Sequence, residues 1–141
     1  MEYRNLGDSE LNVSILSLGC LNFGLFCDQE TTTEIINTAI DLGVNCIDTA
    51  ALYGGPKGHC ETLVGKAIEG QRDKVILATK FGADSNARGS GLKGGGKRDY
   101  IVRSVEESLT RLNIDYIDLY RMHFPDHETP IDETLRALDD L

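Results

Sequence analysis

The sequence predicts an α/β fold in which parallel strands alternate with helices. Short apolar runs are each followed by a segment with apolar residues at helical spacing, and this strand-then-helix unit occurs four times along the chain. Strands connected in this way are parallel and joined by right-handed crossovers. The units therefore predict either an open doubly wound sheet or part of a (β/α) barrel, and 141 residues suffice for one domain.

The first unit combines an apolar run at residues 13–19 with a helix over residues 28–43. Thr31 and Glu34 have the spacing of a capping box, which predicts the start of the helix, and Gly43 is a typical stop. One face of this helix is apolar and is formed by Ile35, Ile36, Ala39 and Ile40.

The second and third units have the same organisation. A strand at residues 44–48 precedes a helix over residues 60–70. The buried stripe of this helix comprises Leu63, Val64, Ala67 and Ile68. The strand at residues 74–80, "KVILATK", is the clearest buried strand, and a long loop separates it from a helix over residues 99–113. Ile101, Val105, Leu109 and Leu112 are aligned on one face of that helix.

The fourth unit begins with a strand at residues 115–123, "DYIDLYRMH". Its helix is expected to begin at Thr129 and Pro130, because proline is favoured in the first turn of a helix. The apolar positions of this helix are Ile131, Leu135 and Leu138.

Three other segments refine the choice of architecture. Residues 1–13, "MEYRNLGDSELNV", predict a small hairpin that turns at Gly7 and Asp8 and would plug one end of a barrel. The turn "GCLNFGLFC" lacks the G-x-G-x-x-G spacing with which a Rossmann unit binds pyrophosphate. The glycine-rich segment at residues 81–98 has no Walker spacing either, so we expect it to be a flexible loop over a site.

Charge and composition exclude several function classes. The net charge of −9 argues against a nucleic-acid partner, which needs Lys and Arg to neutralise phosphates. The first twenty residues contain no long apolar stretch, so we expect neither a signal peptide nor a membrane-spanning helix, and a cytoplasmic protein without a membrane partner. The cysteines lack metal-ligand spacing, which predicts reduced thiols and no metal site. The adjacent His59 and Cys60 are better explained by a loop entering a helix than by a metal or thiol site.

Four reactive side chains fall where a (β/α) barrel places its working residues, at the C-terminal ends of strands and in the following loops. Asp48 ends the second strand, and Tyr53 lies in the loop after it. Lys80 ends the third strand and His123 ends the fourth. Each alone has an ordinary structural explanation, but a lysine at a buried strand end needs a carboxylate partner such as Asp48. The repeat spacing brings all four to one rim.

These four side chains suggest proton transfer. An ammonium close to Tyr53 favours the phenolate and makes the tyrosine a stronger acid. Asp48 would keep Lys80 charged and oriented, and His123 could donate a hydrogen bond to a substrate oxygen. Such a set suits protonation of the oxyanion that forms when hydride adds to a carbonyl.

The motifs around these residues closely resemble those of the aldo-keto reductases. The resemblance runs in order through "YRNLGDSELNVSILSLGCLNFG", "DTAALYGGPKGHCETLVGKAI", "ILATKFG", "SVEESLTRLNIDYIDLYRMHFPD" and "TPIDETLRALDDL", and is closest to the aryl-alcohol dehydrogenase and potassium-channel β-subunit branch. It implies a (β/α)8 TIM barrel and NADPH-dependent reduction of aldehydes or ketones, with Tyr53 as the general acid. The implied catalytic tetrad is Asp48, Tyr53, Lys80 and His123. The implied cofactor-binding residues are Gly19, Cys20, Asn22 and Asp48.

The sequence departs from the family pattern in two residues and in length. Cys60 stands where the family usually has serine, and Val64 where it has leucine. A barrel of this type needs about 250 residues. We therefore expect residues 1–141 to be the N-terminal part of one reductase domain, a half-barrel of four units that stops in its fourth helix. Because the family holds most of its cofactor with the other half, we expect this fragment to be inactive alone and to self-associate through its exposed strand edges.

Two alternatives to a reductase stay open on the sequence. A partner-binding module could keep the reductase scaffold without catalysis. A barrel aldolase would use Lys80 to form a Schiff base, although Asp48 and Tyr53 would then lack clear roles. The expected substrate of the reductase is a small carbonyl compound whose identity the sequence leaves open.

Overall fold

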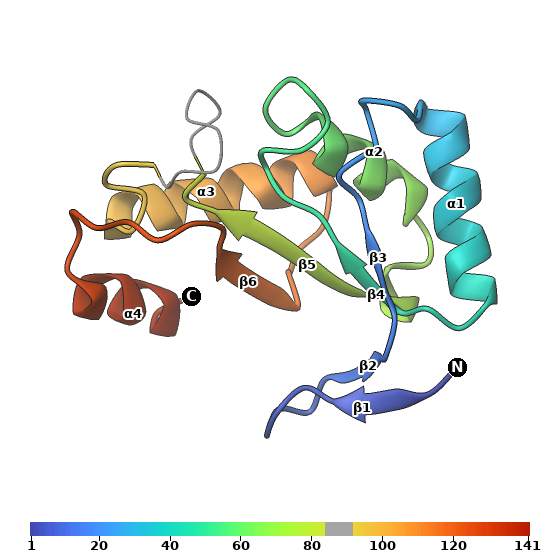
Figure 1. Cartoon of the computed structure of the whole chain (residues 1–141), viewed down its shortest axis with the longest axis horizontal. Helices are drawn as coiled ribbons and strands as arrows, with labels where there is room; N and C mark the ends of the chain where they lie inside the picture. Colours follow the sequence, from blue (N-terminus) through green and yellow to red (C-terminus); the bar gives the residue numbers. More distant parts are fainter. Residues whose placement is uncertain (84–91) are drawn as a thin grey trace.

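The computed structural model describes residues 1–83 and 92–141. Its strands are β1 (Tyr3–Asn5), β2 (Asn12–Ser14), β3 (Ser17–Gly19), β4 (Cys46–Asp48), β5 (Ile76–Phe81) and β6 (Leu119–Met122). Its helices are α1 (Gln29–Asp41), α2 (His59–Ala67), α3 (Arg98–Leu112) and α4 (Ile131–Asp139), with a 3₁₀ turn at Arg72–Lys74. None of the helices in the described residues combines the length and apolarity needed to span a membrane. Strands and helices alternate from β3 to α4, which confirms the predicted α/β class (Figure 1).

Strands β3 to β6 form a parallel sheet in which the spatial order of the strands equals their order in the chain. A doubly wound sheet reverses its strand order at a switch point, whereas successive strands of a barrel wall are neighbours. The sheet therefore has the topology of a partial (β/α) barrel wall. Helices α2 and α3 cover one face of it (Figure 1).

The predicted N-terminal hairpin is present as β1 and β2, which pair antiparallel. Its turn contains Gly7 at a φ of +58°, a conformation that glycine adopts readily. The Tyr3 hydroxyl donates to the Gly43 carbonyl at 2.8 Å, and the Ser14 backbone N–H donates to the Asn45 side chain at 2.7 Å. These bonds fasten the hairpin beside the N-terminal ends of β3 and β4, the end of the sheet opposite the predicted reactive rim (Figure 1).

The single strand predicted over residues 13–19 is divided in the structure. Residues up to Ser14 belong to the hairpin strand β2, and those from Ser17 onward belong to β3. Between them the Ser14 hydroxyl donates to the Leu16 carbonyl at 2.6 Å, and the side chains of Ile15 and Leu16 are exposed. The apolar run concealed this break because two unrelated strands follow each other directly.

Two helix predictions also need correction. The N-cap of α1 is Asp28, whose carboxylate accepts from the backbone N–H of Thr31 at 2.9 Å, so the capping box of Thr31 and Glu34 was wrong. The predicted stop is confirmed, since Gly43 has a φ of +86°. Helix α4 begins at Ile131, so the predicted start at Thr129 and Pro130 was one to two residues early. Its apolar residues Ile131 and Leu135 are exposed in this chain.

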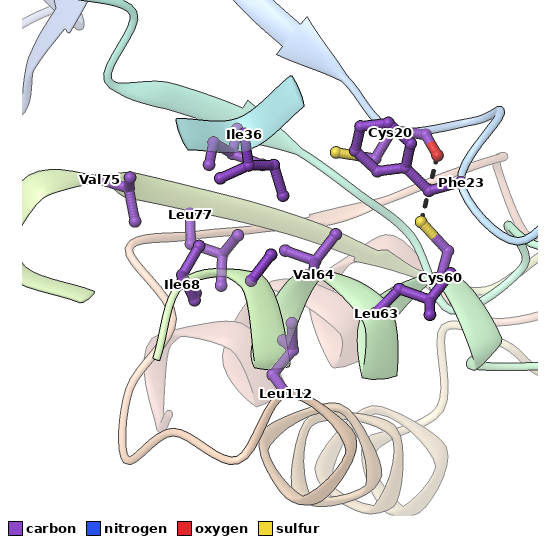
Figure 2. Close-up of a cluster of buried hydrophobic side chains, with 12 residues drawn as sticks. Cys20, Phe23, Ile36, Cys60, Leu63, Val64, Ile68, Val75, Leu77 and Leu112 are labelled. Atoms are coloured by element: carbon purple, nitrogen blue, oxygen red, sulfur yellow. Dashed lines mark hydrogen bonds between the residues drawn. The ribbon is translucent and has the colours of Figure 1, made fainter. Parts of the chain in front are cut away.

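The main core lies between the sheet and the helices (Figure 2). Its buried residues are Cys20, Phe23, Ile36, Ile47, Cys60, Leu63, Val64, Ala67, Ile68, Val75, Leu77 and Leu112. Burial of each large aliphatic side chain stabilises the fold by about 1.5–3 kcal/mol. Helices α2 and α3 approach closely at Gly65, where a Cβ atom would lie 2.2 Å from the Leu112 carbonyl oxygen, so this contact requires glycine.

The alternation of β5 separates the core from the reactive face of the sheet. Leu77, Thr79 and Phe81 point toward the helices and are buried there. Because successive side chains of a strand point to opposite faces, Ala78 and Lys80 lie on the other face of the sheet. That face carries the candidate site.

Candidate active site

The structure brings the four predicted tetrad residues together at the C-terminal ends of the parallel strands. Asp48 is the last residue of β4, and Tyr53 lies in the loop between β4 and α2. Lys80 is the penultimate residue of β5, and His123 directly follows β6. The meeting of residues from three strands confirms the geometric expectation, because parallel strands present their C-terminal ends at one edge.

The Lys80 ammonium is the centre of this arrangement. Its Nζ donates to Asp48 Oδ2 at 2.8 Å, to the Thr49 carbonyl at 2.9 Å and to the Tyr53 hydroxyl at 3.0 Å. An ammonium has three N–H donors, so all three are used. Lys80 is 8% exposed, and in this setting the contact with Asp48 offsets the cost of burying its charge.

The same bond fixes the role of the Tyr53 hydroxyl. Its oxygen accepts a hydrogen from Lys80, so its own O–H hydrogen must point to a different partner. The Lys80 ammonium also lies 4.6 Å from the centre of the Tyr53 ring. Tyr53 therefore presents a hydrogen-bond donor next to a fixed positive charge.

His123 lies against the Tyr53 ring. Its ring meets the Tyr53 ring edge-to-face, with centroids 5.6 Å apart, and stacks on Phe124 at 4.6 Å. Burial lowers the pKa of His123, and the charges of Lys80 and Arg121 reinforce this effect against the opposing effect of Asp48. The imidazole is therefore held neutral near pH 7, with one N–H donor.

Arg121 is a site residue that the sequence reasoning missed. Its Nη2 donates to Oδ1 of Asp48, so the Asp48 carboxylate contacts a cation at each oxygen. The signal was present in the sequence, since Arg121 lies two residues before His123 and strand alternation places them on the same face.

The loop that carries Tyr53 depends on glycine at two positions. Gly54 has a φ of +88°, and a Cβ there would lie 2.6 Å from the backbone nitrogen of Cys60. Gly58 has a φ of +81°, and its Cβ would collide with the Arg111 side chain at 2.1 Å. The loop is therefore packed directly against the start of α2 and against α3.

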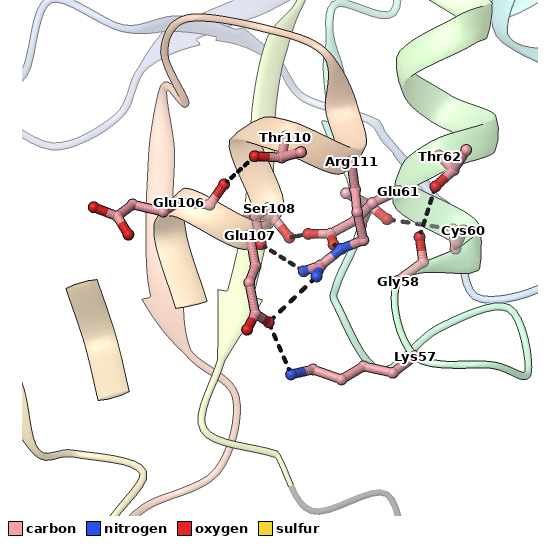
Figure 3. A network of polar contacts seen from close by, with 12 residues as sticks. Lys57, Gly58, Cys60, Glu61, Thr62, Glu106, Glu107, Ser108, Thr110 and Arg111 are labelled. Carbon is pink, nitrogen blue, oxygen red and sulfur yellow. Dashed lines mark hydrogen bonds and ion pairs between the residues drawn. The ribbon is translucent and has the colours of Figure 1, made fainter. Parts of the chain in front are cut away.

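A polar network attaches this loop to α3 (Figure 3). The buried Glu61 carboxylate accepts from Arg111 Nε at 2.7 Å and from the Thr79 hydroxyl at 2.6 Å. At the surface, Lys57 Nζ lies 3.0 Å from a Glu107 oxygen that Arg111 also contacts. Because Thr79 directly precedes Lys80 in β5, the network fixes the position of the Tyr53 loop relative to that strand.

The neighbouring His59 and Cys60 lie where the loop enters α2, as the simpler explanation predicted. His59 is the first residue of α2. The buried Cys60 thiol donates to the Cys20 carbonyl at 3.1 Å and lies 3.3 Å from the Thr49 hydroxyl (Figure 2). Cys60 thus fulfils the hydrogen-bonding role of a small polar residue in place of serine.

The turn after β3 offers space for a cofactor. Gly19 is paired in register with Asp48, and a Cβ built on Gly19 would meet no heavy atom within 4 Å. The exposed Asn22 organises the turn, its carbonyl accepting from backbone N–H groups of residues 25–27. The Cys20 side chain is buried in the core, so this residue could face a cofactor only through its backbone. Among the described residues, the surface above Gly19 is therefore open.

Lys80 is poorly arranged for a Schiff base. A Schiff-base lysine attacks as the neutral amine. Here Lys80 Nζ donates to the Asp48 carboxylate, the Thr49 carbonyl and the Tyr53 hydroxyl, so all three of its hydrogens are already in use. The aldolase alternative is therefore disfavoured.

The glycine-rich segment was predicted to be a flexible loop over the site, but residues 84–91 lie outside the described part of the chain. The structure describes only its two ends. The Leu92 backbone N–H donates to the Gly82 carbonyl at 2.8 Å. Asp126, in the loop after β6, accepts from the Gly96 backbone N–H at 3.0 Å and from the Thr129 hydroxyl at 2.5 Å. The C-terminal end of the glycine-rich segment is thus hydrogen-bonded to the loop that follows His123.

Comparisons with known proteins agree with this geometry. The sequence model of the Aldo/keto reductase family matches residues 16–141. The chain is 41% identical over its whole length to an uncharacterized oxidoreductase, YqkF, of Bacillus subtilis, of which it covers 45%. It is 38% identical over 99% of its length to a probable voltage-gated potassium channel subunit beta of Arabidopsis thaliana, of which it covers 42%.

The fold comparison gives the same result. The structure of aldo-keto reductase AKR11C1 from Bacillus halodurans, in its holo form, superposes on all of the chain with a TM-score of 0.85 and 40% identity, and the chain covers 46% of it. The chain therefore spans less than half the length of the relatives it matches. With the family match over residues 16–141, these likenesses show that the chain belongs to the aldo/keto reductase family.

Proposed function

We propose that this chain supplies the proton-transfer residues of an NADPH-dependent reductase that converts aldehydes or ketones to alcohols. The observation that carries this proposal is the bond from Lys80 Nζ to the Tyr53 hydroxyl at 3.0 Å. Because Tyr53 accepts from Lys80, its own hydrogen is free to be donated to a carbonyl oxygen. Tyr53 is then the general acid of the reaction.

The other tetrad residues support this transfer. Lys80 stabilises the phenolate left behind, and Asp48 keeps the ammonium in place. His123, held neutral, donates its N–H to the same carbonyl oxygen and helps to orient the substrate. Together the two donors stabilise the negative charge that develops on that oxygen.

The cofactor would bind beside this site on the surface of Gly19, Asn22 and Asp48. When bound, NADPH supplies the hydride, which is the part of the reaction that no side chain of this chain can provide. The open space above Gly19 allows the nicotinamide to approach the Asp48 side of the tetrad. The likeness to a structure described as a holo form supports cofactor binding.

The direct test is the loss of NADPH absorbance in the presence of a series of small aldehydes and ketones. Tyr53→Phe removes only the hydroxyl, and we expect its kcat to fall by about 10²–10⁴-fold while NADPH binding is retained. Tyr116→Phe is the matched control, because Tyr116 is exposed and lies at the N-terminal side of β6, away from the rim. Equal activity of Tyr53→Phe and the wild-type protein would contradict the proposal.

A second candidate function is a partner-binding module on the reductase scaffold. It is favoured by the 38% identity to a probable potassium channel subunit beta. This alternative predicts saturable NADPH binding without turnover of any carbonyl compound. A titration of the protein with NADPH, combined with the carbonyl-reduction assay, therefore separates the two functions.

A further inference from the structure

Arg121 is a second cation at the candidate active site and lies outside the tetrad. Its Nη2 donates to Asp48 Oδ1, while Lys80 donates to Asp48 Oδ2 at 2.8 Å. The carboxylate is therefore held at both oxygens by cations from two different strands. The Arg121 side chain is 46% exposed and that of Asp48 is 23% exposed, so the contact lies at the edge of the site.

The contact depends on a small residue in the strand between. Asp48 in β4 is opposite Ala78 in β5, and Lys80 in β5 is opposite Arg121 in β6. Arg121 therefore crosses β5 to reach Asp48, and Ala78 presents only a methyl group on that face. Lys80 and Arg121 are directly opposed like charges, an arrangement that is unfavourable without a carboxylate shared between them.

This arrangement has two consequences for Tyr53. With Oδ1 held by Arg121, only Oδ2 of Asp48 faces Lys80, so the ammonium keeps its remaining donors for the Thr49 carbonyl and the Tyr53 hydroxyl. The local charges also no longer cancel, since two cations face one carboxylate. An excess positive charge at this edge stabilises negative charge that develops on a nearby oxygen.

We propose that Arg121 is a positioning residue of the reductase site, which orients the Asp48 carboxylate and provides the excess positive charge that the reacting carbonyl oxygen experiences. The inference rests on the proposed function, because it assigns Arg121 a part in that reaction. Its effect on His123 can nevertheless be measured without any turnover. In the part of the chain that the structure describes, the Tyr53 ring contacts His123, and the charged groups that act on its imidazole are Asp48 from β4, Lys80 from β5 and Arg121 from β6.

The test compares the intact wild-type protein with Arg121→Met, which keeps an apolar stem but removes the guanidinium. The imidazole of His123 is titrated by NMR. Its signal is assigned as the one that is absent from the spectrum of His123→Gln. We expect the pKa of His123 to rise in Arg121→Met, because a neighbouring cation is lost and Asp48 is less neutralised. In carbonyl reduction we expect kcat to fall about tenfold, with KM for NADPH changed less than about twofold. Arg121→Lys should recover most of both properties.

Arg136→Met is the matched control, because Arg136 in α4 is 80% exposed and should change neither quantity. If Arg121→Met does not fold, Arg121→Gln takes its place with the same expectations. If Arg121→Met or Arg121→Gln folds and the pKa of His123 is the same as in the wild-type protein, the proposal is overturned. An unchanged kcat in the same variant would also overturn it. If the wild-type protein binds NADPH but does not reduce any carbonyl compound, the proposed function fails, and the His123 titration alone decides whether Arg121 sets the charge of the site.

Discussion

Glu61 and Arg111 form an ion pair between helices α2 and α3, with Arg111 Nε 2.7 Å from a carboxylate oxygen of a Glu61 side chain that has no exposed surface. The other oxygen of Glu61 accepts from the Thr79 hydroxyl at 2.6 Å. A buried charge is tolerated only when it is paired and hydrogen-bonded, and Glu61 meets both conditions. The pair therefore joins the start of α2, the strand that carries Lys80, and α3.

Glu61→Gln should destabilise the fold strongly. The substitution keeps the shape of the side chain but leaves the Arg111 guanidinium without its buried anion, and we expect the free energy of unfolding to fall by about 3 kcal/mol. Urea denaturation of the intact protein measures the change. Glu106→Gln on the exposed face of α3 is the control and should change stability by less than about 0.5 kcal/mol. A similar midpoint for both variants would show that the buried pair is not needed.

Asp48→Asn should also destabilise the protein, because it leaves Lys80 and Arg121 opposed without a carboxylate between them. We expect a loss of about 2–4 kcal/mol in urea denaturation. The double variant Asp48→Asn/Lys80→Met should recover part of this loss, since it no longer buries an unpaired ammonium. If the double variant loses as much free energy of unfolding as the two single variants together, the two residues are not coupled and the prediction is wrong.

His123 should make stability depend on pH in a definite direction. Its pKa is lowered in the folded protein, chiefly by burial, so the unfolded chain binds a proton at a higher pH than the folded protein does. The contribution of His123 to stability is therefore complete above its unfolded pKa of about 6.5 and is lost as the pH falls from there through the folded pKa. Denaturation of the wild-type protein and His123→Gln at several pH values measures the difference. A wild-type protein that gains stability relative to His123→Gln on acidification would refute this sign.

Gly19→Ala should separate cofactor binding from folding. A Cβ at Gly19 meets no atom within 4 Å, so we expect the free energy of unfolding to change by less than about 1 kcal/mol. If the nicotinamide approaches this surface as proposed, the added methyl group should weaken NADPH binding about tenfold or more, as measured by fluorescence titration. Unchanged affinity in the folded variant would place the cofactor elsewhere.

Much of the candidate site could be predicted from sequence because it depends on strand position. Asp48, Lys80 and His123 follow apolar runs at a regular spacing, and the parallel connection of those runs brings them to one edge. Strand alternation places Arg121 on the same face as His123, but it does not identify the partner of Arg121. Its contact with Asp48 crosses a whole strand and depends on the small side chain of Ala78, which a linear pattern does not reveal.

The errors in the fold prediction have similar causes. Asp28 and Thr31 both belong to residue types that cap helices, and only the observed hydrogen bond distinguishes them. The run at residues 13–19 looks continuous because apolar patterning does not record the change of partner at Ile15. Self-association through the strand edges stays a prediction.

The register of the parallel sheet also bears on how the protein is made. Asp48 and Lys80 are 32 residues apart in the chain, and Glu61 and Arg111 are 50 residues apart. Arg111 must therefore be synthesised before Glu61 can gain the partner that it has in the folded protein. Contacts so distant in sequence form slowly and leave apolar strands exposed in the meantime. Glu61 is thus expected to stay in contact with water during synthesis until Arg111 has emerged and folded back onto it.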